Sequence, residues 1–503
     1  MVAAAAFWSA TGDAMAGKAN DTLVVAFQRG ILSADYTFNT KREDIIHSEL
    51  IDDGLFYIPP DTLKPVPLAA KSAKWIDDTT LDVTIREGIK FHDGSPLTAD
   101  DVVYTYQWTL NPKGKTRRHK QYKVWIKSVE KIGPLVVRFK LKAPYPLAET
   151  SLGRSVPLRK KGAFDAIAKT GEEPRILEIN GIGPYRLVKL EPGKQSVYER
   201  FEGYYKGSPK GRPAIKTIII RGIPDWGTQQ AEVMRGGIDV MYAVPTDVAE
   251  SVAATRRAVH TSGPTMRVGF LVIDAMGRSG KDHPLTKLDV RRAMMHAINR
   301  EAIVKYMVKG RAKVIHAACH PAQFGCPTDV RKYEYNPAKA KALLKAAGYG
   351  SGANIDIWAY REKEVAEAIA ADLTTVGFKV NLRYVKLTAL NKARKDGKIQ
   401  AYFGTWGSGG VADASAIATR HWLPNDDRNM SGDPKVSEYI VGAERTNDPA
   451  KRKALYDNGF KLIAEQVYWA PLYAFTMNYI TSTDTAFVAP EDGLLRPYLM
   501  KWK

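Results

Sequence analysis

The chain has 503 residues, of which 45% are hydrophobic and 25% are charged, so it has the composition of a globular protein and not of a disordered one. Its length favours two or three lobes over a single core. The 74 basic and 54 acidic residues give a net charge of +20, but the basic residues are spread along the chain and accompany no nucleic-acid-binding motif. This charge therefore indicates a solvated basic surface and no nucleic-acid partner, and it leaves an acidic ligand or an anionic membrane surface open.

The N-terminus has features of an export signal. Val2 to Ala10 is a short apolar run, and Ala14-Met15-Ala16 has the small-x-small form of a signal-peptidase site. We interpret residues 1–19 as a signal-peptide remnant or a disordered N-terminus, and the mature protein as soluble and exported to the periplasm. No later stretch reaches the ~18 apolar residues that span a bilayer, so we expect no transmembrane segment.

Strand patterns dominate the first half of the chain. Residues 21–27 form an apolar run that predicts a buried strand, and residues 81–86 alternate apolar and polar positions as a half-buried strand does. Thr98 then opens a helix as its capping residue. Residues 135–141 and 217–220 are further strand candidates.

The second half is more helical. Apolar residues follow helical spacing over 290–298. Asn336-Pro337 begins a helix that Gly348 ends, with cap, first-turn proline and final glycine mutually consistent. Another helix runs from Asp448-Pro449 to Glu465. Because strands alternate with helices, the chain is predicted to form α/β lobes.

Sequence signatures of catalysis are missing. There is no His-Glu-x-x-His and no Gly-x-Ser-x-Gly. Residues 277–281 lack the glycine spacing of a phosphate loop, and Gly181-Ile-Gly183 lacks the third glycine of a dinucleotide loop. These absences argue against an enzyme, so we expect no catalytic site and no cofactor. The alternative is a secreted hydrolase acting on peptides or conjugates, because a catalytic triad is a spatial arrangement that no short motif needs to reveal.

The chain contains two cysteines, Cys319 and Cys326. An even, low cysteine count with this close spacing favours one small disulfide loop in an exported protein. The neighbouring His316 and His320 leave a metal site as the alternative, but they lack the usual paired zinc spacing. We predict the disulfide and no metal.

Short motifs follow one another along most of the chain. The longest is the run at 85–102, and the others are 52–56, 68–72 with Trp75 and Asp78, 181–185, 203–207, 237–239, 290–293, 297–300, 335–339 and 347–349. In this order they resemble the ABC-transporter solute-binding proteins of the dipeptide, oligopeptide and nickel type, family 5. One departure is Asp53, which stands where this family usually has glutamate. The collinear series carries the resemblance, since any one motif alone would be weak.

The resemblance implies an α/β, periplasmic-binding-protein-like fold, with two lobes around a hinged cleft and a third domain inserted in lobe I. The expected layout is lobe I at 20–55, 174–265 and 485–503, the inserted domain at 56–173, and lobe II at 266–484. The motif at 91–102 reads as a turn and a capped helix start, so we expect it to be scaffold and not a contact to ligand.

The resemblance also implies a function. Such a protein captures a peptide or peptide-like, amino-acid-derived solute, closes about its hinge, and docks on an inner-membrane ABC permease driven by an ATPase. Closure requires only that the ligand bind the closed state more tightly than the open state. We expect a monomer.

The resemblance places the ligand site near Trp406. In the family an aromatic residue here packs on the ligand, and an aspartate about three positions later grips the α-ammonium of a peptide. Trp406 matches the aromatic residue, but Gly409 or Gly410 stands at the aspartate position and Asp413 comes later. A buried ammonium needs a paired carboxylate. Either Asp413 reaches back to the ligand, or the protein does not bind free peptide N-termini.

Further candidates flank this segment. Tyr402 precedes Trp406, and Arg420, His421 and Trp422 combine a fork donor, a titratable ring and a large aromatic group. Their alternative roles are a surface salt bridge for Arg420 and core packing for Trp422. Candidates elsewhere are Tyr36, Tyr122 and Arg154. Because the family aspartate is missing while arginine is present, we hypothesise a ligand with at least one anionic group, anchored by Arg420.

Overall fold

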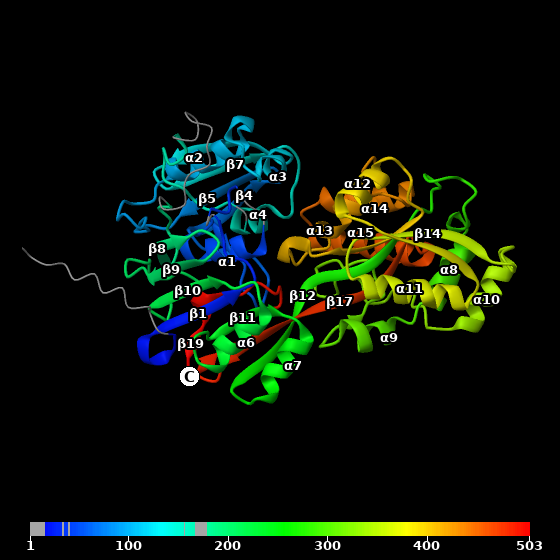
Figure 1. Cartoon of the computed structure of the whole chain (residues 1–503). Helices are drawn as coiled ribbons and strands as arrows, with labels where there is room; N and C mark the ends of the chain where they lie inside the picture. The colour runs from blue at the N-terminus through cyan, green and yellow to red at the C-terminus, as the bar shows by residue number, and fades with distance from the viewer. Residues whose placement is uncertain (1–15, 33–34, 39–40, 155, 166–178) are drawn as a thin grey trace, which may run out of the picture.

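The computed structural model describes residues 16–32, 35–38, 41–154, 156–165 and 179–503. They form two α/β lobes, with a smaller domain attached to the first lobe (Figure 1). Two long strands, β12 (Ala258–Ile273) and β17 (Trp469–Ser482), run from one lobe into the other. The predicted signal-peptide remnant falls largely on residues 1–15, which lie outside the described residues. None of the helices in the described ranges is both long and apolar enough to cross a membrane.

Each part has its own strands and helices. Lobe I contains η1 (Lys18–Asn20), β1 (Thr22–Phe27), α1 (Arg42–Ile51), β8 (Tyr185–Glu191), β9 (Gln195–Arg200), β10 (Thr217–Gly222), α6 (Trp226–Met234), β11 (Val240–Val244), α7 (Thr246–Ala254), β18 (Thr485–Ala486), η7 (Pro497–Leu499) and β19 (Lys501–Trp502). The inserted domain contains β2 (Phe56–Tyr57), β3 (Val66–Pro67), β4 (Ala70–Asp77), β5 (Thr80–Ile85), α2 (Ala99–Leu110), η2 (Pro112–Gly114), α3 (His119–Lys123), β6 (Ile126–Gly133), β7 (Val136–Leu141) and α4 (Ala148–Arg154). Lobe II contains η4 (Pro284–Thr286), α8 (Leu288–Ala297), α9 (Arg300–Ile303), η5 (Val304–Val308), β13 (Lys313–Val314), α10 (Pro337–Ala346), β14 (Ala353–Ala359), α11 (Lys363–Thr375), β15 (Phe378–Tyr384), α12 (Leu387–Lys395), β16 (Ala401–Trp406), η6 (Ser408–Gly410), α13 (Ser415–His421), α14 (Pro434–Glu444) and α15 (Pro449–Gln466).

One continuous sheet passes through both lobes. Its strand order is β15-β14-β16-β12-β17-β11-β1-β10-β9-β8, with β13 paired to β17. The inserted domain has a separate antiparallel sheet in the order β4-β5-β7-β6. The lobes are therefore connected through two neighbouring strands in the middle of the long sheet.

The pairing of these two strands changes where they cross between the lobes. Pro264 pairs with Thr476, and the next aligned pair is Val268 with Ala474. Three residues of β12 thus lie opposite Phe475 alone. Such a bulge interrupts the ladder and bends the strand, so we take 265–267 and Phe475 as the hinge.

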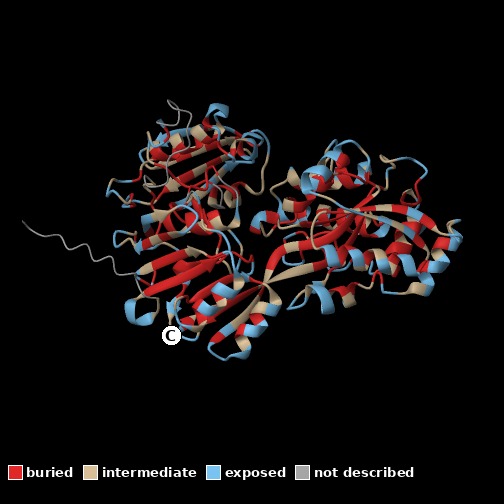
Figure 2. Ribbon diagram, in the orientation of Figure 1, coloured by how far each residue is buried: buried red, intermediate tan, exposed pale blue. Residues whose placement is uncertain are grey.

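The apolar cores separate at the same place. The cores of lobe I and the inserted domain use residues up to Ala258 and from Tyr479 onward, whereas those of lobe II use residues from Val268 to Tyr473. Figure 2 accordingly shows buried residues inside each body. Because each lobe buries its own apolar surface, the lobes can rotate about the hinge as units.

Most predicted elements are present at nearly the predicted positions. The strands at 21–27 and 81–86 are β1 and β5. The helix that Thr98 opens is α2, where Asp101 Oδ2 accepts the Thr98 backbone N–H at 2.8 Å and closes a capping box. The helices after Asn336 and Asp448 are α10 and α15, and both cap side chains accept first-turn N–H groups.

Candidate ligand-binding site

Two cavities lie where lobe II faces the rest of the molecule. One, of about 510 Å³, is lined by Trp75 and Asp78 of the inserted domain and by Asn447 of lobe II. Asn447 Nδ2 donates to the Asp78 backbone oxygen at 3.3 Å. The other, of about 460 Å³, lies at the hinge, with Thr246 and Phe475 in its wall. Both volumes suit a small ligand, and rotation about the hinge would change both cavities.

Trp406 is the last residue of β16 and is half-buried. Its Nε1 donates to the Ala416 backbone oxygen at 2.8 Å. Its ring meets the His421 ring edge-on, with 5.7 Å between the centroids. The indole is therefore held in one orientation while part of it stays accessible.

Asp413 is engaged in a buried ion pair. Both of its carboxylate oxygens accept from the Arg452 guanidinium, Oδ1 at 2.8 Å, and Oδ1 also accepts the Ser415 N–H at 2.9 Å. A ligand ammonium would have to compete with this bidentate pair. Asp413 is thus paired within the protein and is not free to bind a ligand ammonium, which is the role expected of the family aspartate.

Three of the predicted site residues lie in the core of lobe II. Trp422 is 1% exposed and packs against Trp469 and Phe460. Tyr402 is buried, and burial raises the pKa of its hydroxyl to about 12. His421 is also buried, and neither of its ring nitrogens has a hydrogen-bond partner among the described residues. Burial holds the pKa of His421 well below its ordinary value.

The remaining predicted residues are dispersed. Arg420 is exposed in the last turn of α13. Tyr36 is buried under the Arg118 guanidinium, 3.8 Å from its ring centroid, and Tyr122 is fully buried with its hydroxyl donating to a backbone oxygen of α4. Arg154 ends α4, but its side chain lies outside the described part of the structure. The structure therefore does not gather these residues around Trp406.

At Thr405, which precedes Trp406 in β16 and points to the opposite face of the sheet, two arginines converge on one hydroxyl. Thr405 Oγ1 accepts from Arg267 Nη1 at 3.0 Å and from Arg361 Nη1 at 2.9 Å. With both lone pairs of Thr405 occupied, its own proton points elsewhere and can be donated to a ligand. Arg361 also pairs with Glu362, which lines the hinge cavity.

Arg267 lies in the hinge bulge with no carboxylate within ion-pair distance in the described chain. Burial, and then the positive charges of Arg361 and Arg42, lower the pKa of Arg267 to about 10. Its guanidinium also lies 6.0 Å from the Phe475 ring centroid. This concentration of positive charge at the hinge is the electrostatic feature that best fits an anionic ligand group.

Sequence reasoning missed both arginines. Strands β14 and β16 are parallel neighbours, so their C-terminal ends lie at the same edge of the sheet. Arg361 follows the end of β14 and Trp406 ends β16, so the order of strands would have placed them together. Arg267 had no such signal, because its position depends on the bulge opposite Phe475.

The predicted disulfide is confirmed. Cys319 and Cys326 are bonded, with 5.7 Å between their Cα atoms. Within the described residues no cluster of three or more histidine, cysteine or acidic side chains could hold a metal.

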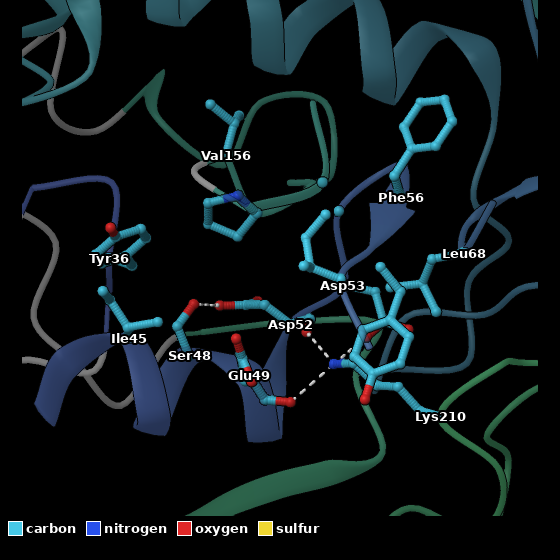
Figure 3. A pocket seen from close by; sticks show the side chains of 15 residues that line it. Tyr36, Ile45, Ser48, Glu49, Asp52, Asp53, Phe56, Leu68, Val156 and Lys210 are labelled. Carbon is cyan, nitrogen blue, oxygen red and sulfur yellow. Dashed lines mark hydrogen bonds and ion pairs between the residues drawn. The ribbon is translucent and has the colours of Figure 1, made fainter. Parts of the chain in front are cut away.

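A small cavity of about 40 Å³ lies beside α1 (Figure 3). Here Lys210 Nζ is 2.6 Å from Asp53 Oδ1 and donates to the Glu49 backbone oxygen at 2.9 Å. The hydroxyls of Tyr204 and Tyr205 donate to Asp53 Oδ2 at 2.8 and 2.7 Å. The space suits about one water, far less than a ligand needs, so we assign this network a structural role.

Each of the two lobes has its own apolar core, and a strand pair with a bulge joins them. Cationic and aromatic side chains lie near this hinge. This architecture is that of a ligand-binding protein of the periplasmic-binding-protein type. The model of the bacterial extracellular solute-binding proteins, family 5, matches residues 64–429. The chain belongs to this family, whose members are extracytoplasmic solute-binding components of ABC importers.

Individual relatives agree with this assignment. The chain is 25% identical over 438 residues to the glutathione-binding protein GsiB of Salmonella paratyphi A, covering 83% of this chain and 82% of that protein. It is 29% identical over 441 residues to the dipeptide-binding protein of Escherichia coli, covering 80% of each. The structure of HbpA2 from Haemophilus parasuis shares the fold, with a TM-score of 0.85 at 22% identity over 96% of this chain and all of that one. These relatives support a binding protein, and none supports the alternative hydrolase.

Proposed function

We propose that this protein captures a peptide-like solute with at least one anionic group between its lobes and delivers it to an inner-membrane ABC permease with its ATPase. It acts as a periplasmic monomer. The observation that carries the proposal is the convergence of Arg267 and Arg361 on Thr405, at the end of β16 next to the hinge. Two of the relatives are named for binding glutathione and dipeptides, and both of these ligands carry carboxylates and peptide bonds.

An anion at this position would offset an existing repulsion. Arg267 is half-buried, and burial and then the positive charges of Arg361 and Arg42 lower its pKa, while Glu362 opposes them more weakly. A carboxylate can accept from a guanidinium through two parallel hydrogen bonds, while the Thr405 hydroxyl adds a third donor. Since Asp413 is engaged with Arg452, recognition of the anionic end carries more of the specificity than recognition of an ammonium.

Closure about the hinge completes the proposed site. We propose the lobe layout expected from the sequence, with the return to lobe I at Phe475 in place of residue 484. Residues 476–482 support this placement, because they pair with the first half of β12 and partly with β11. A ligand that contacts both lobes favours the closed form, and the closed form is the one that docks on the permease.

The test begins with native mass spectrometry of the purified protein, which should reveal a co-purified solute. Calorimetric titration then compares a dipeptide that has no acidic side chain with its C-terminal amide, and S-methylglutathione with its diamide, in which both carboxylates are amidated. We expect the amides to bind about tenfold or more weakly, because they lack the anionic group.

Arginine variants then locate the anchor. Arg361→Met and Arg267→Met should weaken binding of the acid forms about tenfold or more and remove the preference over the amides. Arg383→Met, at an exposed arginine of lobe II, is the matched control. Arg420→Ala tests the residue that the sequence favoured. A larger loss with Arg420→Ala than with Arg361→Met would contradict the proposed anchor.

A further inference from the structure

The disulfide loop at 319–326 lies directly against the loop that follows Trp406. The Phe324 N–H donates to the Ala412 backbone oxygen at 3.0 Å, and the Ala414 N–H donates to the Phe324 oxygen at 2.9 Å. These bonds form a parallel bridge between Phe324 and Asp413. Two segments that are distant in sequence are thus joined by backbone pairing at the edge of the ligand site.

The side-chain amide of Gln323 also connects the two loops. Its buried Nε2 lies 3.0 Å from Ser408 Oγ, 2.9 Å from the Val411 oxygen and 3.1 Å from the Asp413 oxygen, and it donates its two hydrogens among them. Its Oε1 accepts the His320 N–H at 3.0 Å, which fixes the orientation of the amide. One side chain therefore holds three points of the loop after Trp406.

The held loop has only two backbone hydrogen bonds of its own among the described contacts, from Gly410 N–H to Gly407 O at 3.3 Å and from Val411 N–H to Ser408 O at 3.0 Å. It contains Gly407, Gly409 and Gly410, and the three residues at 408–410 all have positive φ, including Ser408 at 48°. Glycine allows many backbone conformations, and a non-glycine residue at positive φ is unfavourable unless its surroundings hold it. This conformation thus depends on the contacts from outside the loop.

The disulfide in turn holds Gln323. Within the bridged segment, the Gln323 N–H donates to the His320 oxygen at 2.9 Å and the Cys326 N–H donates to the Gln323 oxygen at 3.1 Å. The bond between Cys319 and Cys326 closes these turns into a short ring and restricts its alternative conformations.

We propose that Gln323, held by the Cys319–Cys326 disulfide, is a positioning residue that fixes the loop after Trp406 in its ligand-ready conformation. Solute affinity consequently depends on the disulfide being formed. The inference rests on the proposed function for its effect on binding, because it takes this loop as part of the ligand site. Its structural half, the ordering of the loop, is tested without any ligand.

The first measurement is hydrogen exchange of the unliganded protein. Gln323→Met keeps a similar side-chain volume and removes the donors, and Cys319→Ser with Cys326→Ser removes the bridge. Both should speed exchange of the Val411 and Ala414 amides about tenfold or more, and leave other parts of lobe II unchanged. Gln229→Met is the matched control, since Gln229 is equally buried and donates to a backbone oxygen in lobe I.

The second measurement is titration with S-methylglutathione and a dipeptide. Both the Gln323 variant and the double serine variant should bind about tenfold more weakly than the Gln229 variant. Unchanged exchange at Val411 and Ala414, or faster exchange spread evenly over lobe II, would overturn the inference. If the unaltered protein binds neither peptide, the proposed function fails, while the exchange measurement still decides the role of Gln323.

Discussion

Two buried polar regions of this molecule have different roles, one in the stability of lobe I and one in holding a loop of lobe II. In lobe I, Asp53 and Lys210 form an internal ion pair that two tyrosine hydroxyls complete. In lobe II, the loop after Trp406 accepts neutral hydrogen bonds from Gln323, next to the ion pair of Asp413 with Arg452. The first region unites two motifs that carry the family resemblance, at 52–56 and 203–207. The second departs from the family pattern. Asp53 keeps a carboxylate where the family usually has glutamate, so the comparison indicates that these motifs build the scaffold, and under the proposed function the altered loop after Trp406 bears on the choice of ligand.

Lys210→Met tests whether the lobe I network stabilises the fold, and it has the largest expected effect. Removing the ammonium leaves the Asp53 carboxylate buried without its partner, which should lower the free energy of unfolding by about 3–5 kcal/mol. Chemical denaturation followed by circular dichroism measures the change. Lys206→Met, at an exposed neighbouring lysine, should have little effect. A loss of stability as small as that of the control would refute a structural role for the network.

Trp406 and Trp422 of lobe II differ in exposure and should differ in their effect on binding. Trp406→Ala should weaken solute binding by about 1.4 kcal/mol or more, tenfold, because it removes a partly accessible aromatic ring at the end of β16. Trp422→Phe should leave affinity nearly unchanged, since Trp422 is enclosed by core residues. Titration with a peptide that the unaltered protein binds checks both. Equal losses of affinity would mean that Trp422 also reaches the ligand.

Much of the fold could be predicted because its signals are local. The cap at Asn336 and the proline after it mark the start of α10 within the chain itself. The capping box at Thr98 works in the same way. The close spacing of Cys319 and Cys326 likewise indicated their bond. Each of these signals needs only residues that are near one another in sequence.

The candidate site could be predicted only in part, because its contacts are distant in sequence. Trp406 was recognised from its motif, but the partner of Asp413 is Arg452, 39 residues later. Arg267 reaches Thr405 across 138 residues through the hinge. Composition and spacing carry no information on such pairs. They emerge only when the strand order and the bulge are known.

The buried His421 in the core of lobe II makes the free energy of unfolding depend on pH. Burial, and then the charges of Arg428, Arg394 and Arg420, hold its pKa in the folded protein well below the ordinary 6.5. Below pH 6.5 the unfolded chain therefore binds a proton at this histidine that the folded chain does not bind. The contribution of the neutral His421 to the free energy of unfolding is therefore present above pH 6.5 and is lost as the pH falls below that value.

His421→Phe isolates this contribution and gives the smallest expected effect. Between pH 6.5 and 5, the free energy of unfolding of the variant should fall less steeply than that of the unaltered protein, by up to about 1.4 kcal/mol per pH unit. At neutral pH the change should be small or stabilising, because phenylalanine suits a site formed by Phe270, Trp406 and Trp469 and leaves no unpaired ring nitrogen. Denaturation series at matched ionic strength check the slope. An identical slope would mean that His421 is protonated or hydrogen-bonded in solution, and that this part of lobe II opens to water more readily than its packing indicates.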